Sequence, residues 1–484
     1  MILLPDLVLA VAILIWGGTF FLGRFNLSHK NNVIAGILAH LISMLCLVFT
    51  IDGTTVVASD AMVFLPNILL LLRVSLWFTV LILLIQIHGA RDIQHLQKPR
   101  FALVTLGCLF FLDILLFSNN LALSFVFLIL IAFLRQFLFA MNVNGEAAAE
   151  GLFKGWILTS LLVMVTICAL QFVALKSSGL QFQTISSFMI QKSGASLESL
   201  GMVVGITFPF LMLAGIFPFF FFDVDHSQGT TWSALSVSSV LITGGVLTSL
   251  WKTILLVFGS FVMGTDLHKV VQALFLFNGF WLVAFCFTQP DPKRFYRSFS
   301  LLLWTSAIIA GLEGGTQGIA ITTYVLVSSF LWAPVFALAW SAFFDHSQCP
   351  NLFLFRGIAK ENRSLTVFYF FVLAIPTWFP GFPGFIAVPR QLAVLLRRGE
   401  ITEFFLLGLL HTLILYLICT MIVRIQFGES STEVKEFANR DGVMRYGVWG
   451  RSVVFLTLFV LLGLGVFGNR SVMLMENIVK NFLN

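Results

Sequence analysis

The chain has 484 residues, of which 59% are hydrophobic and only 10% are charged. Soluble globular proteins carry about 25% charged residues, so this composition excludes a water-soluble enzyme, a nucleic-acid-binding protein and a disordered regulator. A membrane-spanning helix needs about 20 apolar residues, so the chain has enough for about 14 of them. The net charge of +6 is spread along the chain, which indicates an orientation signal and no nucleic-acid partner.

Hydropathy along the chain predicts an all-α polytopic membrane protein with about 14 transmembrane helices. The predicted spans, in chain order, are 2–23, 32–51, 67–89, 101–117, 121–142, 152–175, 199–222, 232–263, 269–288, 300–319, 321–343, 366–388, 402–425 and 452–468. Most lysines and arginines fall in the loops after the first, third, ninth, eleventh and thirteenth helices. The positive-inside rule therefore predicts that these loops face the cytoplasm or the matrix.

Two of the predicted helices are interrupted by proline and glycine. The interruptions contain Gly215 and Pro218 in the seventh helix, and Pro380, Gly381, Pro383 and Gly384 in the twelfth. Proline removes a backbone donor, and within lipid the freed carbonyl groups must be satisfied by protein or by trapped water. We therefore expect both breaks to face a protein interior or a hydrated cavity.

The two interruptions lie five helices apart, so each would be the fourth member of a five-helix unit. A repeated unit with an odd number of helices must be inverted in the membrane. The predicted organisation is N-terminal helices in 1–117, with helix 4 shared, a first repeat in 101–263, an inverted second repeat in 269–425, and an amphipathic matrix-side loop with a last span in 426–484. Matching broken helices in two halves indicate an ion or substrate path, although proline and glycine are also generally common in membrane helices.

Five segments share a pattern with one known family. They are LLPDLVLAVAILI from Leu3, EAAAEGLFKGWILTSLL from Glu146, AGIFPFFFFDVDHSQG from Ala214, TQPDPKRFYRSFS from Thr288 and FPGFPGF from Phe379. In this order they resemble subunit 2 of respiratory complex I (NADH:ubiquinone oxidoreductase), a family of antiporter-like membrane subunits. The resemblance covers nearly the whole chain.

The resemblance implies a non-catalytic membrane-arm subunit that contributes to assembly and to redox-coupled proton translocation. It implies a multi-pass location in the mitochondrial inner membrane, with a bacterial plasma membrane as the alternative. The implied partners are other antiporter-like membrane-arm subunits and membrane lipids such as cardiolipin. NADH, FMN, iron–sulfur clusters and ubiquinone would belong to other subunits, and we expect no cofactor or metal in this chain.

The family also uses a central chain of charged residues, which is largely missing here. The aligned positions carry Ile129, Glu150, Leu213, Thr243, Leu303 and Val388. Apart from the glutamate, none of these side chains carries a proton. If the chain still moves protons, other ionisable residues must therefore replace the missing ones.

Five ionisable residues are candidates for a displaced proton path, because each one inside a span costs about 2.5–3.5 kcal/mol or more. They are Arg135, Lys154, Lys252, Arg390 and His411. Arg135 could instead snorkel to the membrane edge, Lys154 could form an edge pair with Glu150, and His411 could be a neutral, hydrogen-bonded histidine. Lys252 is the best candidate for a buried lysine, and Arg390 could form an exit with Glu313.

Two alternatives to a complex I subunit remain open. A cation/proton antiporter subunit would transport ions without redox partners, and a non-pumping scaffold of a respiratory complex would pack against its neighbours around a dry axis. Arg73 and Asp113, in the third and fourth helices, are expected to neutralise each other or a neighbouring subunit.

Overall fold

The computed structural model describes residues 9–14, 34, 36–43, 66–89, 97–141, 146–191, 197–227, 229–262, 266–312, 315–347, 351–354, 356–361, 363–377, 379–430, 432, 435 and 447–483. Most of the first two predicted spans, most of the segment 427–450 and Glu313 lie outside the described residues. The chain forms two compact units, Met1–Val270 and Val271–Asn484.

The regular structure of the described residues is helical, and it confirms an all-α polytopic membrane protein. Eight of the described helices are long and apolar enough to cross a membrane, or nine if one sharply bent pair counts as a single span. Helices that are apolar on every side are stable only in lipid or in a protein core. Each of these eight helices overlaps a span that hydropathy predicts.

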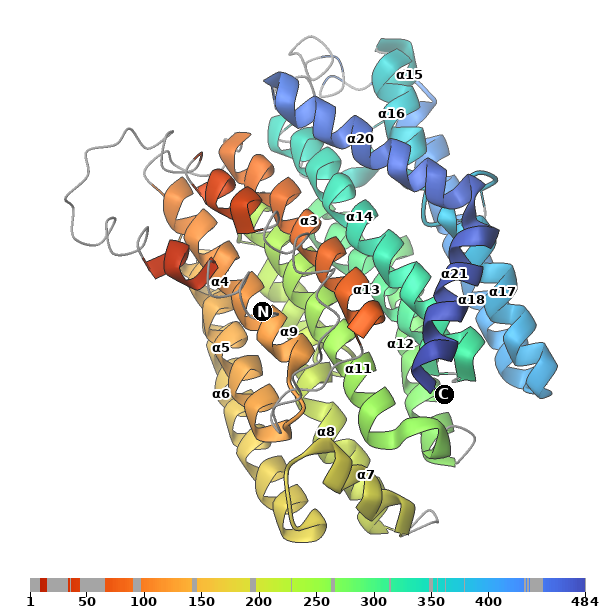
Figure 1. The fold of residues 1–484 in the computed structure, drawn as a ribbon. Helices are drawn as coiled ribbons and strands as arrows, with labels where there is room; N and C mark the ends of the chain where they lie inside the picture. Colours follow the sequence, from red (N-terminus) through yellow and green to blue (C-terminus); the bar gives the residue numbers. More distant parts are fainter. Residues whose placement is uncertain are drawn as a thin grey trace. The chain divides into compact units, whose positions relative to one another are not determined.

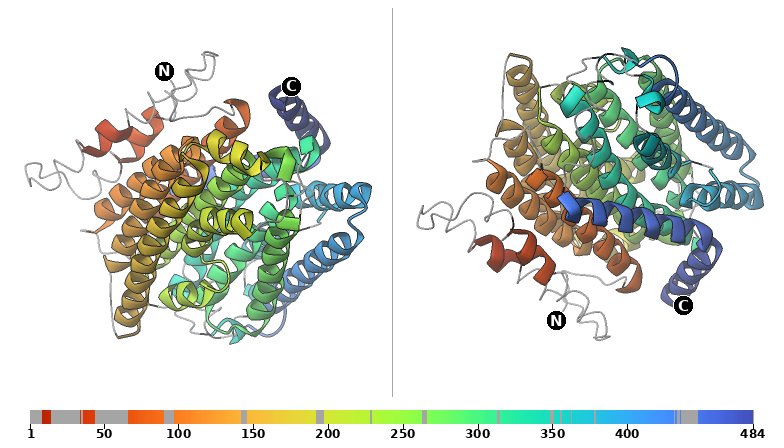
Figure 2. Two further views of the ribbon diagram at one scale, coloured as in Figure 1. Left: turned by 90° about the horizontal axis from the view of Figure 1, so that it is seen from below. Right: turned by 90° about the horizontal axis from the view of Figure 1, so that it is seen from above.

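The first unit begins, in the described residues, with a series of long helices. They are α3 (Pro66–Gly89), α4 (Lys98–Phe117), α5 (Leu121–Ala140), α6 (Glu146–Ser177), α7 (Phe182–Gln191), α8 (Leu197–Ala214), α9 (Phe220–Ser227), α10 (Trp232–Ser236), the π-helical segment η1 (Val237–Ile242) and α11 (Thr243–Val262). Neighbouring helices in the chain pack side by side, as α3 to α6 do in Figure 1 and in the orange-to-tan ribbons of Figure 2.

The continuous span α10–η1–α11 is the centre of the first unit. In its most apolar stretch 89% of the residues are buried, against 33% for α6. The exposed face of α6 carries a stripe of large apolar side chains, Phe153, Ile157, Leu161 and Met164. Their spacing of three and four residues places them on one side of the helix, so this side is suited to contact lipid or a neighbouring subunit.

The second unit contains α12 (Asp266–Thr288), which starts at the end of the first unit, and a further series of helices. They are α13 (Pro292–Leu312), α14 (Gly315–Ser347), the 3₁₀ turn η2 (Leu352–Leu354), α15 (Ile358–Glu361), α16 (Arg363–Ala374), α17 (Pro383–Arg398), α18 (Ile401–Gln426), α20 (Gly447–Val466) and α21 (Gly468–Leu483). Helix α14 is central here, since it packs against α13, α16, α17, α20 and α21.

Two expected loops are helical. The segment 289–299 was expected to be a basic loop, but α13 starts at Pro292 because the Asp291 side chain accepts hydrogen bonds from the backbone N–H groups of Lys293 (2.7 Å) and Arg294 (3.1 Å). Arg297 is consequently buried within α13. The C-terminal tail forms α21, and the angle between α20 and α21 is 80°. The bend between these two helices is visible in Figure 1.

Candidate functional site

The first interruption separates α8 from α9. Helix α8 ends at Ala214, Gly215 has a left-handed φ of 78°, and α9 begins at Phe220. A Cβ atom at Gly215 would lie 2.7 Å from Oδ2 of Asp223. Glycine is required for both reasons, since L-residues avoid this φ and the carboxylate packs directly against the Cα atom. Pro218 lies within the turn.

Arg135 of α5 connects the two sides of this break. Its side chain is 4% exposed, and it forms an ion pair with Asp223 of α9. One guanidinium nitrogen donates to the carbonyl of Leu213 in the last turn of α8 (3.1 Å), and Nε donates to Oγ of Ser238 in η1 (2.8 Å). Arg135 therefore lies in the protein interior and does not snorkel, and it satisfies a carbonyl that the helix break leaves without a helical donor.

The π-helical segment η1 lies at the same place. Ser238 is its second residue, and the segment leads directly into Thr243 and α11. The three glycines of this span, Gly244, Gly245 and Gly259, all come after the irregular turn. π-helical turns within α-helices are frequent at functional sites, and here one contacts the broken helix through Arg135.

Lys252, on α11, is the buried lysine that the sequence indicated. The residue is 1% exposed. Its ammonium group donates to the carbonyls of Leu115 (3.1 Å) and Ser118 (2.7 Å), and it lies 5.2 Å from the centre of the Phe182 ring. These carbonyls belong to the C-terminal end of α4, where the helix dipole attracts a cation. Among the described residues, no carboxylate forms an ion pair with Lys252.

The end of α4 is shaped by the turn that leads into α5. Asn120 caps α5, since its side chain accepts a hydrogen bond from the N–H of Ala122 (2.8 Å). Asn120 also forms an isolated antiparallel bridge with Gln181, just before α7. These contacts hold the backbone of Ser118 extended, which directs its carbonyl to Lys252.

The second interruption separates α16 from α17. Since Pro376 has no N–H group, the carbonyl of Val372 four residues earlier loses its helical donor. Nε1 of Trp332 on α14 donates to this carbonyl at 2.6 Å. Gly381 has a φ of 93°, and a Cβ atom at Gly384 would lie only 2.3 Å from the carbonyl oxygen of Thr377.

The four proline and glycine residues predicted at this break lie in two different structural elements. Pro380 and Gly381 lie in the turn between the helices, while Pro383 and Gly384 form the first turn of α17. Proline is well suited to a first turn, because the N–H groups there have no helical acceptor. The described residues of the interruption are Ile375–Thr377 and Phe379–Phe382, so it starts earlier than the FPGFPGF motif.

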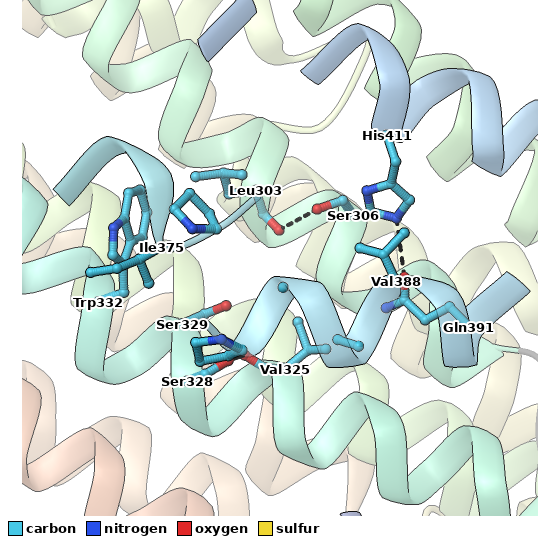
Figure 3. A pocket seen from close by; sticks show the side chains of 14 residues that line it. Leu303, Ser306, Val325, Ser328, Ser329, Trp332, Ile375, Val388, Gln391 and His411 are labelled. Carbon is cyan, nitrogen blue, oxygen red and sulfur yellow. Dashed lines mark hydrogen bonds between the residues drawn. The ribbon is translucent and has the colours of Figure 1, made fainter. Parts of the chain in front are cut away.

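A cavity of about 50 Å³ lies beside this second break (Figure 3). Its wall includes His411 of α18, Gln391 of α17, Ser306 of α13, and Ser328 and Ser329 of α14. A polar cavity needs roughly 10–15 Å³ to hold one water molecule, so this one has room for more than one. The second break therefore faces the protein interior, beside a cavity whose wall is mostly apolar and includes these five polar side chains.

His411 and Gln391 face each other across the cavity wall, with Nε2 of the histidine 3.1 Å from Oε1 of the glutamine. His411 is 7% exposed. The hydrogen-bond partner of this histidine is therefore a side chain and not a backbone carbonyl. The imidazole ring also lines the cavity, which has room for water.

The other two candidates lie nearer the surface. Lys154 pairs with Glu150 (2.9 Å), as its spacing predicted, and also with Asp225 of α9 (3.2 Å). Arg390 lies on α17 and contacts α21 through Asn469 (3.0 Å) and Glu476 (3.5 Å). The expected pair of Arg73 with Asp113 is present at 3.0 Å and buried.

Four site residues were not identified from the sequence: Asp223, Ser238, Trp332 and Gln391. Asp223 lies two residues before the aspartate that matched the family pattern, and its acidic type within an apolar run was the available signal. The others are uncharged, and their roles depend on contacts across 20 to 103 positions in the chain. Among residues with described positions, no group of three or more His, Cys, Asp or Glu side chains could hold a metal ion.

The fold is shared with chains of several solved membrane complexes. A chain of the Mrp complex from Dietzia sp. DQ12-45-1b matches with a TM-score of 0.80 and 13% identity, covering 99% of this chain and 96% of that one. A chain of respiratory complex I from Thermus thermophilus with bound NADH matches at 0.76 and 16%, covering 99% of each. A chain of the membrane-bound sulfane sulfur reductase, an archaeal respiratory membrane complex, matches at 0.79 and 13%, covering 99% and 96%.

No protein-family model and no curated protein matches the sequence. At identities of 13% to 16%, the structural matches establish the fold and leave the individual activity open. The chain is a multi-pass membrane protein, and its fold matches chains of the Mrp complex, of respiratory complex I and of the membrane-bound sulfane sulfur reductase.

Proposed function

We propose that this chain is the subunit 2 type of membrane-arm subunit in a respiratory complex I, located in a mitochondrial inner membrane. The proposal is supported above all by the correspondence in fold over 99% of this chain and 99% of the complex I chain from Thermus thermophilus. The ordered sequence segments that resemble subunit 2 support the finer assignment. Its partners would be neighbouring antiporter-like subunits, while other subunits would hold NADH, FMN, iron–sulfur clusters and ubiquinone.

Within this role, proton transfer in the first unit would use Lys252. A lysine buried without a carboxylate partner among the described residues is costly in a membrane protein, and such residues mark ion or proton paths. Ser238, which accepts a hydrogen bond from Arg135, precedes Lys252 by 14 residues on the span α10–η1–α11. At a rise of 1.5 Å per residue, the two residues are about 21 Å apart along the helix axis. Buried hydroxyl groups lie between them on the same span: Thr243, Thr248 and Ser249.

In the second unit, the cavity beside His411 would provide the water-accessible step. A histidine ring can donate a hydrogen bond from one nitrogen and accept one at the other, and the cavity places His411 among the serine hydroxyls of α13 and α14. The missing charges of the family would thus be replaced by residues at other positions. The displaced path consists of Lys252 in the first unit and His411 with Gln391 in the second.

Native purification of the tagged full-length chain tests the assembly role. The expected result is co-migration with a large assembly that oxidises NADH in the gel. A chain that purifies alone, or in an assembly without NADH oxidation, would refute the complex I proposal. Mass spectrometry of the purified assembly identifies which membrane-arm subunits accompany the chain.

A cation/proton antiporter subunit is the second candidate, and the TM-score of 0.80 to a chain of the Mrp complex favours it. This candidate predicts cation-dependent proton movement in inverted membrane vesicles that are energised without NADH. The complex I proposal predicts proton movement only during NADH oxidation. A non-pumping scaffold predicts co-purification with unchanged pumping when Lys252 and His411 are replaced.

A further inference from the structure

A second, larger cavity lies in the second unit, between the beginning of α14, the end of α17 and the helix α21. It has a volume of about 290 Å³. Arg390 and Arg397 of α17 line it, seven residues apart and therefore on one side of that helix. The rest of the wall is mixed: Ile321 of α14, Val394 of α17 and Met473 of α21 are apolar, while Gln317 of α14 and Glu476 of α21 are polar. The cavity thus combines two guanidinium groups with a hydrocarbon surface.

The charges around this cavity are not balanced. Arg390 contacts the carboxylate of Glu476 at 3.5 Å and the side chain of Asn469 at 3.0 Å, so α21 holds its guanidinium in place. Arg397 donates to the neutral side chain of Gln317 at 3.1 Å and forms no ion pair among the described residues. The two arginines and one glutamate leave a net positive charge, which attracts an anion.

The cavity lies where a membrane boundary is expected. The apolar span of α14 begins at Gly315, and Gln317 and Ile321 are in its first two turns. Helix α21 turns by 80° from α20, and it buries Val472 and Val479 against the unit while Leu474 stays exposed. Helix α21 is thus amphipathic and is bent sharply away from the preceding span. Such a helix is suited to the interface between lipid headgroups and acyl chains.

The arginines also conflict with the expected charge distribution. By the positive-inside rule, the end of the twelfth predicted helix faces the side of the membrane that carries few basic residues. Arg390, Arg397 and Arg398 nevertheless gather there. Arg397 and Arg398 lie in the last turn of α17, where cations stabilise the helix dipole. Arg390, two turns earlier, is outside the reach of that effect.

We propose that this cavity binds the phosphate group of an anionic phospholipid. Arg390 and Arg397 would hold the phosphate oxygens, since guanidinium groups match phosphate in shape and charge, and an acyl chain would lie along Ile321, Val394 and Met473. Basic pockets between membrane helices bind anionic headgroups in this way. The site is independent of the proposed respiratory role, because any multi-pass protein in an anionic membrane meets such lipids.

The test uses the full-length chain in the assembly with which it purifies, stripped of lipid in detergent and titrated with phosphatidylglycerol under native mass spectrometry. The double variant Arg390→Gln/Arg397→Gln should bind about thirtyfold more weakly, since each arginine near a headgroup contributes about a factor of five. Arg470→Gln on α21 is the matched control. It removes an exposed arginine of the same region that does not line the cavity, and its affinity should stay within about twofold of the unmodified chain.

Because Arg390 also holds α21, the double variant could lose structure. Arg397→Gln alone removes an exposed side chain with one neutral partner, and it should weaken binding about fivefold without changing thermal unfolding. Equal affinity of this variant and the unmodified chain would overturn the proposal. Full competition by millimolar inorganic phosphate, or equal binding of phosphatidylcholine, would also overturn it, since the site would then not select an anionic lipid.

Discussion

The ion pair between Arg135 and Asp223 should stabilise the first unit through the break between α8 and α9. Replacing Asp223 by asparagine keeps the side-chain volume and leaves a buried arginine without its carboxylate. Removing one partner of a buried pair costs about 3–5 kcal/mol. Arg135 keeps its hydrogen bonds to Ser238 and to the Leu213 carbonyl, so we expect the lower end, about 3 kcal/mol.

The reverse change, Arg135→Met, should cost more, because it leaves the carboxylate buried and also removes the donor to the Leu213 carbonyl. The apolar double variant Arg135→Met/Asp223→Leu should recover most of the loss. The remaining cost should be about 1–3 kcal/mol, which is typical of an unsatisfied buried carbonyl. The double variant should therefore be more stable than the sum of the single losses implies, which is the signature of a coupled pair.

The free energy of unfolding is measured by denaturation in mixed detergent micelles, followed by tryptophan fluorescence. Glu150→Gln is the control, because it breaks the exposed pair with Lys154, and it should leave unfolding unchanged within error. The single variants for this comparison are Arg135→Met and Asp223→Leu, and losses that simply add in the double variant would refute the reasoning. A fully stable Asp223→Asn variant would refute it as well.

Three further changes test other parts of the site. Gly215→Ala should destabilise the chain by about 2 kcal/mol or more, since a left-handed φ alone costs an L-residue about 1–2 kcal/mol; Gly463→Ala, where a Cβ atom meets nothing within 4 Å, should not. Trp332→Phe leaves the carbonyl of Val372 without its donor and should cost about 1–3 kcal/mol in the same unfolding assay. Lys252→Met should abolish proton uptake by liposomes that contain the purified assembly while the assembly stays intact; unchanged pumping would remove Lys252 from the path.

The order of the membrane spans could be predicted because hydropathy is a local property. The predicted span 402–425 corresponds to α18 (Ile401–Gln426), and 67–89 corresponds to α3 (Pro66–Gly89). The start of α13 was missed although the sequence carried its signal, an aspartate followed by proline. The basic residues Lys293, Arg294 and Arg297 favour an orientation loop at 289–299 by the positive-inside rule, and they outweighed that signal.

The contacts of Arg135 could not be predicted in the same way. A helix that is apolar on every side has no amphipathic pattern to show which face meets which neighbour. The partner carboxylate lies 88 positions further along the chain, so nothing local distinguishes a buried arginine from one at the membrane edge. The cavity beside His411 was hidden for the same reason, because its wall is formed by four helices, α13 and α14 with α17 and α18, that meet only in the tertiary structure.

The sequence by itself determined a membrane-spanning, helical chain and the approximate places where two helices break, since apolar length and proline chemistry act within a few residues. The tertiary structure alone decided what each break contacts. At the first break a carbonyl meets Arg135, and at the second a carbonyl meets Trp332. These partners follow from burial in a low-dielectric interior, where every freed carbonyl and every charge needs a nearby group from another helix.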